Sequence, residues 1–165
     1  MKLTTRARYA VMAMVDIAAH DGKHPVCLAD IAEREEISLP YLEQIFACLR
    51  RCGLVASVRG PGGGYRLARP AAQIRIAEVF CAMDEPLRAT RCEDTWDHGC
   101  RQDRAKCRTH ALWEELGCVV DLYLSSVSLA DVASGRIGAC GRPVRPVPIP
   151  EDVAALAVPA GKALT

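Results

Sequence analysis

The sequence predicts a mainly α fold in which a helix-turn-helix is followed by a β-hairpin and, further along the chain, by a long apolar helix. Half of the residues are hydrophobic whereas aromatic residues make up only 5%, a balance that favours helices over a β-sandwich or barrel. An amphipathic segment, residues 38–51, follows a shorter helical segment after a tight turn. A glycine-rich stretch, residues 60–64, separates two strand-like runs, as expected of a hairpin.

Two helices are expected before the amphipathic segment. Residues 4–20 carry apolar side chains nearly all round, so this helix should be buried on more than one side. Residues 21–23, Asp-Gly-Lys, end it, and the apolar positions of residues 28–35 indicate a second, shorter helix.

The third helix has the clearest pattern. Ser38 is a suitable N-cap, and Pro40 is tolerated in a first turn. The predicted buried stripe has helical spacing and consists of Leu42, Ile45, Phe46 and Leu49. The outward side carries Tyr41, Glu43, Gln44, Arg50 and Arg51. As the second helix of a helix-turn-helix it would enter the major groove, where glutamine pairs with adenine and glutamate accepts from cytosine. An ordinary solvated helix face has the same composition, so this helix alone leaves both interpretations open.

The segment after the third helix favours DNA binding. Strand-like residues 54–59 and 65–69 flank the glycine-rich residues. Glycine-rich nucleotide-binding loops lead from a strand into a helix, whereas this one leads into another strand, so a hairpin, or wing, is the better interpretation. Arg59 at its base and Arg66 beyond its tip are placed to meet backbone phosphate or a narrow minor groove.

The second half of the chain is expected to hold three further helices. Residues 72–83 have the pattern of a core helix. After His110 comes a long helix whose residues 116–124 contain one charge, Asp121. A helix this apolar needs burial on two sides, which a second copy of the chain would provide in a two-fold dimer. A short final helix over residues 129–133 follows.

Charge is distributed unevenly although the formal net charge is only +1. Residues 41–70 hold five arginines against one acid, Glu43, whereas residues 71–135 hold eleven acids and seven bases. The first of these segments suits a nucleic-acid partner and the second does not.

The cysteines and the N-terminal residues indicate the compartment. Nine cysteines would suggest disulfides in a small secreted protein. Asp16 interrupts the N-terminal apolar run, however, and no stretch approaches the roughly 20 apolar residues that span a bilayer. We therefore expect a cytoplasmic protein without a membrane partner, in which clustered cysteines indicate metal or redox chemistry. Five cysteines are expected to be buried as small hydrophobic residues: Cys27, Cys48, Cys52, Cys81 and Cys118.

Residues 91–113 gather three thiols and an imidazole in the pattern C-x7-C-x6-C-x2-H. The four side chains are Cys92, Cys100, Cys107 and His110, a full tetrahedral ligand set for iron or zinc. The segment is too polar to fold by burying itself, so a metal centre would have to order it. Structural zinc usually uses a short C-x2–4-C pair, whereas widely spaced thiolates with one neutral imidazole suit a releasable iron–sulfur cluster. A disulfide switch among the three cysteines and a set of three unliganded thiols also remain open.

Four stretches resemble the IscR family of bacterial regulators, which sense iron–sulfur cluster supply: MKLTTRARYAVMAM, SLPYLEQIF, SVRGPGGGY and CRTHALW. The similarity covers residues 1–133. It implies a winged-helix homodimer that binds one [2Fe-2S] cluster per subunit and recognises double-stranded operator and promoter DNA. In that family the cluster state alters which promoter sites are bound, and the genes controlled include those of the cluster-assembly machinery, which would also supply the cluster.

The resemblance also implies functional residues. The cluster ligands of the family fall on Cys92, Cys100, Cys107 and His110. Its recognition-helix contacts fall on Ser38, Tyr41, Glu43 and Gln44, and its wing contact falls on Arg59. Charge and position add Arg50, Arg51 and Arg66 to the DNA-binding candidates. The gaps between the cysteines are longer here than in the family and include His98, which we interpret as a solvated loop residue.

These inferences divide the chain into four parts. They are a winged-helix DNA-binding domain (1–83), a linker with the cluster-binding loop (84–110), a dimerisation helix with a short final helix (111–135) and a Pro- and Ala-rich tail expected to be disordered (136–165). No catalytic set stands out, so we expect no enzyme. Two further functions stay open: a redox- or nitric oxide-responsive regulator with another cluster type, and a small electron carrier, which would not need a wing.

Overall fold

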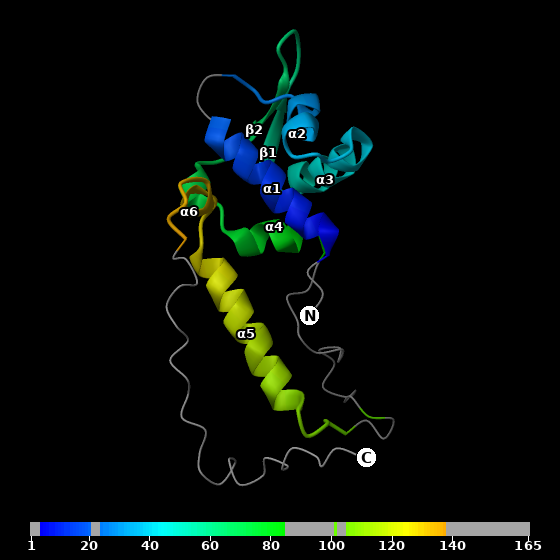
Figure 1. Cartoon of the computed structure of the whole chain (residues 1–165), viewed down its shortest axis with the longest axis vertical. Helices are drawn as coiled ribbons and strands as arrows, with labels where there is room; N and C mark the ends of the chain where they lie inside the picture. Colours follow the sequence, from blue (N-terminus) through cyan, green and yellow to red (C-terminus); the bar gives the residue numbers. More distant parts are fainter. Residues whose placement is uncertain (1–3, 21–23, 85–100, 102–104, 138–165) are drawn as a thin grey trace, which may run out of the picture.

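The computed structural model describes residues 4–20, 24–84, 101 and 105–137. Its elements in order are α1 (Thr5–His20), α2 (Leu28–Arg34), α3 (Leu39–Arg51), β1 (Val55–Val58), β2 (Gly64–Leu67), the 3-10 turn η1 (Ala71–Gln73), α4 (Ile76–Ala82), α5 (His110–Ser126) and α6 (Leu129–Ala133). Figure 1 shows α5 projecting from a body formed by the other elements, on the side away from the hairpin tip. The fold is a winged helix with a long helix in its C-terminal half, as the sequence predicts.

Helix α1 lies at the centre of the body. Its buried residues include three alanines, which let neighbouring elements approach closely: Ala7, Ala10, Ala13, Met14, Asp16 and Ile17. Contacts of α1 reach α3, α4, α6 and β2, so the expected burial on more than one side is confirmed.

Helices α2 and α3 form the predicted helix-turn-helix. The four residues of the predicted stripe on α3 are all fully buried: Leu42, Ile45, Phe46 and Leu49. Helical spacing alone is enough to predict this face because all four side chains enter one core.

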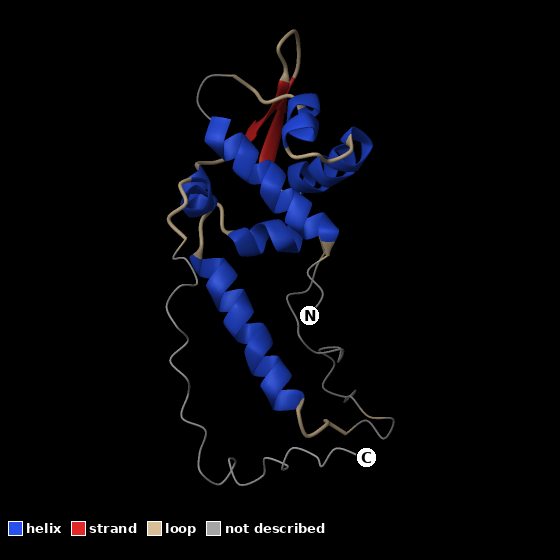
Figure 2. Ribbon diagram, viewed as in Figure 1, coloured by secondary structure: helices blue, strands red, loops and turns tan. Residues whose placement is uncertain are grey.

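The wing is a two-stranded antiparallel hairpin, drawn as red arrows in Figure 2. Val55 pairs with Leu67 and Val58 with Gly64. Val26, before α2, joins the hairpin through Tyr65, with N···O distances of 2.9 and 2.8 Å in the two directions. A Cβ on Gly64 would lie 2.3 Å from the Val26 oxygen, so glycine is needed for this close approach.

The predicted single helix over residues 72–83 is wrong in its first turn. Residues 71–73 form a 3-10 turn, and α4 begins only at Ile76. The chain straightens between them because Arg75 forms an isolated antiparallel bridge with Ser128. The Ile76 N–H donates to the Val127 oxygen at 3.1 Å, and the Leu129 N–H donates to the Ile74 oxygen at 2.8 Å. Contacts with a segment some fifty residues away therefore override the local helical pattern.

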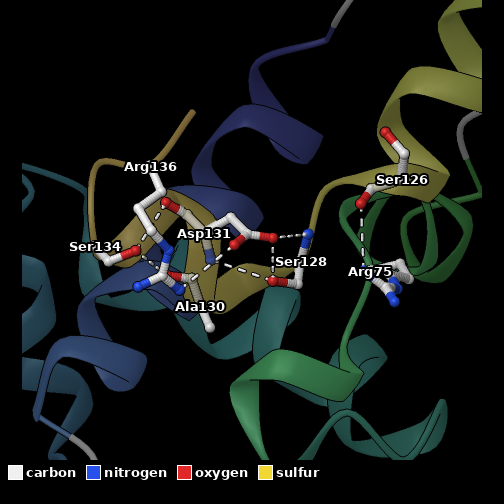
Figure 3. A network of polar contacts seen from close by, with 7 residues as sticks. All are labelled: Arg75, Ser126, Ser128, Ala130, Asp131, Ser134 and Arg136. Atoms are coloured by element: carbon white, nitrogen blue, oxygen red, sulfur yellow. Dashed lines mark hydrogen bonds and ion pairs between the residues drawn. The ribbon is translucent and has the colours of Figure 1, made fainter. Parts of the chain in front are cut away.

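The same bridge holds the end of α5 to the body. Arg75 Nη1 donates to the Ser126 oxygen at 3.3 Å, as Figure 3 shows. Beyond it, Ser128 and Asp131 form the capping box of α6. The bonds that the Ser128 hydroxyl and N–H donate to the carboxylate of Asp131 hold its pKa below the usual range.

A second polar group links the wing to α4. Arg69, just beyond β2, donates to the Glu78 carboxylate and, at 3.2 Å, to the Gln73 oxygen. The other oxygen of Glu78 accepts from the Arg75 N–H at 2.8 Å. Partial burial raises the pKa of Glu78, but the bonds from Arg75 and Arg69 outweigh it and leave that pKa lowered. Arg75 therefore shares Glu78 with Arg69 of the wing and also bonds to the end of α5.

Helix α5 exposes most of its apolar side chains. Leu112, Trp113, Leu116, Val119, Leu122 and Tyr123 are between 40% and 69% exposed. Within the described part of the chain, no helix is long and apolar enough to cross a bilayer.

Candidate DNA interface and metal-binding segment

Helix α3 turns Glu43, Gln44, Arg50 and Arg51 to solvent, on the side away from its buried stripe. Ser38 stands at the N-cap position with extended backbone, but its side chain accepts no hydrogen bond from the helix. The predicted N-cap position of Ser38 is therefore confirmed, although its side chain does not form the cap bond. An N-cap side chain accepts from the second or third helical N–H; here the second residue is Pro40, which has none.

The third helical N–H, that of Tyr41, instead donates to the backbone oxygen of Ser38 at 3.1 Å. The side chain of Ser38 is exposed. Its hydroxyl is thus left for an external partner, beside the first turn of α3.

The side chain of Tyr41 packs against a residue that lies outside the helix-turn-helix. Its ring packs edge-on against Tyr9 of α1, with ring centroids 6.0 Å apart. The side chain is half-buried, and an edge-to-face contact fixes ring orientation. No local pattern predicts this support, because Tyr9 is thirty-two positions earlier in the chain.

The wing packs against α3. Phe46, on the buried side of α3, packs against Tyr65 of β2 with ring centroids 4.7 Å apart. Arg59, just after β1, and Arg66, within β2, are both exposed. The two arginines and the outward face of α3 therefore keep a fixed relative placement.

A partly buried ion pair ties α2 to α1. Asp16 is 6% exposed, and Arg34 donates to both of its carboxylate oxygens at 2.8 and 2.7 Å. The bond to Asp16 raises the pKa of Arg34. Sequence reasoning missed this pair, since it treated Asp16 only as a break in an apolar run; a lone acid on a buried helix face was the available signal.

The predicted metal-binding segment, residues 91–113, is described only in part. Cys92 and Cys100 lie outside the described residues. Cys107 is half-exposed, with Sγ 3.6 Å from the Thr109 hydroxyl. His110 opens α5, is 8% exposed, and donates its N–H to the Cys107 oxygen at 3.0 Å. Its Nε2 lies 3.6 Å from a carboxylate oxygen of Glu114.

One thiol and one imidazole of the predicted set are thus neighbours on one turn. Among the described residues no group of three or more His, Cys, Asp or Glu side chains could hold a metal ion. Any centre built on Cys107 and His110 must draw its other ligands from outside the described residues.

The expected burial of five cysteines is confirmed for Cys48 alone. Cys27, Cys52, Cys81 and Cys118 are exposed. Cys27 and Cys52 are cap residues of α2 and α3, where side chains leave the helix surface. The expectation rested on the general preference of cysteine for the core. In this chain the position of each cysteine on its helix determines its exposure instead.

Comparisons with known proteins agree with this architecture. Residues 3–135 match the family model Rrf2, described as an iron-dependent transcriptional regulator. A putative HTH-type transcriptional regulator of Azotobacter vinelandii is 54% identical over 134 residues, which cover 81% of this chain and 80% of that protein. The HTH-type transcriptional regulator IscR of Photorhabdus laumondii is 52% identical over 136 residues, covering 82% and 81%.

A solved structure shares the fold. The structure of T. potens IscR superimposes with a TM-score of 0.67 at 36% identity, covering 82% of this chain and 88% of that one. The resemblance inferred from the sequence is therefore confirmed, and the relatives are transcriptional regulators, not enzymes. The chain belongs to the Rrf2 family of iron-dependent transcriptional regulators.

Proposed function

We propose that this DNA-binding transcription regulator reads operator DNA through α3 and the wing, and that a [2Fe-2S] cluster controls which promoters it selects. The observation that carries the proposal is the fixed placement of α3 and the wing by the Phe46–Tyr65 contact. A protein that contacts both a major groove and the adjacent DNA backbone needs a fixed distance between its recognition helix and its wing.

The proposed DNA contacts divide into two kinds. Glu43 and Gln44 face the base edges, with Ser38 and Tyr41 beside them at the start of α3. Arg59 meets phosphate or a narrow minor groove. Arg50, Arg51 and Arg66 contact phosphate, which positions the protein without reading sequence.

The donor set fits an iron–sulfur cluster. Cys92, Cys100, Cys107 and His110 would hold it as three thiolates and one neutral imidazole. Cys107 is half-exposed, which allows a cluster to be delivered and lost. When bound, the cluster supplies a redox-active, releasable centre; we propose that it is delivered by the cluster-assembly machinery in the cytoplasm.

A second copy of the chain is the proposed partner of α5. Leu112, Leu116, Val119 and Tyr123 recur at intervals of three or four residues and form one exposed stripe. Pairing of two such stripes about a two-fold axis would place two winged helices on two half-sites of an operator.

The proposed control acts through the start of α5. Binding of the cluster by residues 92–110 would order that polar segment, which leads directly into the first turn of α5. The far end of α5 is bonded to the body at Arg75 and Ile76. The spacing of the two winged helices, and with it the set of operators tolerated, would then differ between cluster-loaded and cluster-free protein. Cluster-assembly genes are the proposed targets.

Replacement of Arg59 by alanine tests the DNA-binding surface. The Arg59→Ala variant should bind an operator and an unrelated duplex more weakly, because a phosphate contact is lost. The slope of log affinity against log salt concentration should fall by about 1. Arg136→Ala is the matched control, since Arg136 is exposed and pairs with Asp131 at 3.5 Å, outside α3 and the wing. Affinity and slope unchanged in Arg59→Ala would contradict the proposed surface.

A further inference from the structure

Two arginines from different helices donate to one sulfur atom, that of Cys48 on α3; the three residues form a basic corner at the junction of α1 and α3. Arg6 in the first turn of α1 donates from Nη2 to Cys48 Sγ at 3.0 Å, and Arg51 at the end of α3 donates from Nη2 to the same sulfur at 3.6 Å. Cys48 is buried, whereas Arg6 is half-buried and Arg51 is exposed. Sulfur is a weak hydrogen-bond acceptor, so these two contacts alone hold the guanidinium groups only weakly.

The positive charge of this corner is not balanced within the described part of the chain. No carboxylate among the described residues forms an ion pair with Arg6 or Arg51. Like charges held close together repel, so folding alone gives no reason for this arrangement. An anion bound between the two groups would turn that repulsion into attraction.

The position of Arg6 adds a second unfavourable interaction. A cation in the first turn of a helix opposes the helix macrodipole, and the first turn of α1 contains no acidic residue. Arg51 at the end of α3 interacts favourably with the dipole of its own helix, so the unfavourable charge is that of Arg6. The electrostatics of this corner favour a bound anion at the start of α1.

This corner borders the face that α3 offers to DNA. Gln44 and Arg51 are seven residues apart, about two helical turns, and both are exposed. Tyr41 and Cys48 have the same spacing and lie on the flank that α1 covers, through Tyr9 and Arg6 respectively. Figure 1 shows the N-terminal end of α1 beside α3.

We propose that Arg6 and Arg51 form a phosphate clamp that takes one backbone phosphate of the bound duplex at the edge of the major groove. The clamp rests on the proposed reading of DNA by α3 and adds α1 to the interface. Guanidinium groups suit this task because their planar forks match phosphate oxygens in a bidentate way. The contact would fix how deeply and in which register α3 lies in the major groove, without recognising the base sequence.

The test measures the affinity of the full-length protein for an operator duplex and for a scrambled duplex over a range of salt concentrations. Arg6→Gln should weaken binding to both duplexes by the same factor. The double variant Arg6→Gln/Arg51→Gln should lower the slope of log affinity against log salt by about 1, because one phosphate is lost. Arg6→Lys, which keeps the charge, should retain most of the slope.

Arg8→Gln is the matched control, since Arg8 is exposed on α1 and the change removes the same charge; it should leave the affinity and the slope unchanged. Thermal unfolding of each variant separates a folding defect from a loss of contact. Wild-type affinity and slope in Arg6→Gln would overturn the clamp, as would a loss of about 2 units of slope in the double variant, which indicates two separate phosphates. If Arg59→Ala lowers the slope while the double variant does not, the clamp fails together with the proposed phosphate contact of Arg51, and the DNA binding proposed for the wing stands.

Discussion

The carboxylate of Asp16 connects α1 to the helix-turn-helix. It is 6% exposed and accepts both bonds of the Arg34 guanidinium, which belongs to α2. Taking a carboxylate out of water is costly unless it is paired and hydrogen-bonded. The pair therefore specifies how α2, the first helix of the helix-turn-helix, is placed on α1.

Loss of the Asp16 charge should destabilise the fold. Asp16→Asn keeps the shape of the side chain but removes one charge-assisted bond to Arg34, so the free energy of unfolding should fall by about 2 kcal/mol. Urea denaturation measures it. Glu33→Gln, an exposed acid on α2, is the control and should stay within about 0.5 kcal/mol of wild type. Equal unfolding midpoints for the two variants would mean that the pair contributes nothing.

At the scale of elements, the sequence predicts those helices and strands whose buried residues follow regular helical or strand spacing. The stripe of α3 and the glycine-rich hairpin could be predicted because spacing and turn chemistry determine them. The break before α4 could not, since the bridge between Arg75 and Ser128 joins segments far apart in the sequence. The burial of Asp16 had a local signal, a lone acid on a buried helix face, but its partner Arg34 belongs to another helix and could not be identified from that pattern.

The candidate site divides in a similar way. The exposed face of α3 and the arginines of the wing followed from helical spacing and charge. The roles of Ser38 and Tyr41 came from the family resemblance, and their physical settings, a missing cap bond and the ring of Tyr9, are visible only in the fold. Whether Cys92 and Cys100 join Cys107 and His110 stays a prediction, as both lie outside the described residues.

Helix α5 supplies the next prediction. A carboxylate in the middle of a paired apolar stripe would be buried without a partner, so Leu116→Asp should weaken self-association by at least about a hundredfold, or roughly 2.7 kcal/mol. Sedimentation velocity would show wild type at twice the 17.9 kDa of one chain and the variant near the mass of one chain.

Leu122→Asp is the control from the same helix. Leu122 is 69% exposed but lies about a quarter-turn away from the stripe of Leu112, Leu116, Val119 and Tyr123. This variant should remain a dimer. Wild-type protein that sediments as a single chain at micromolar concentration would contradict the assignment of α5 to the dimer.

At the scale of the whole molecule, the start of α5 and the proposed DNA-reading face are far apart. Helix α5 has 17 residues and is therefore about 25 Å long; its first turn carries His110, and its last turn is bonded to the body at Arg75. Figure 1 places the wing tip at the opposite end of the molecule from the start of α5. The proposed control by a cluster would therefore have to be transmitted along α5, through the proposed contact between two copies of the chain.

The most direct measurement compares the promoter fragments bound by anaerobically purified, cluster-loaded protein with those bound by metal-free protein at the same concentration and salt. We expect two different sets of fragments, because in the proposed mechanism cluster binding changes the spacing of the two winged helices. The Cys107→Ala variant should lack the visible absorption of the loaded protein and bind only the metal-free set. Equal affinity of the loaded and metal-free forms for every fragment would contradict control of promoter selection by the cluster.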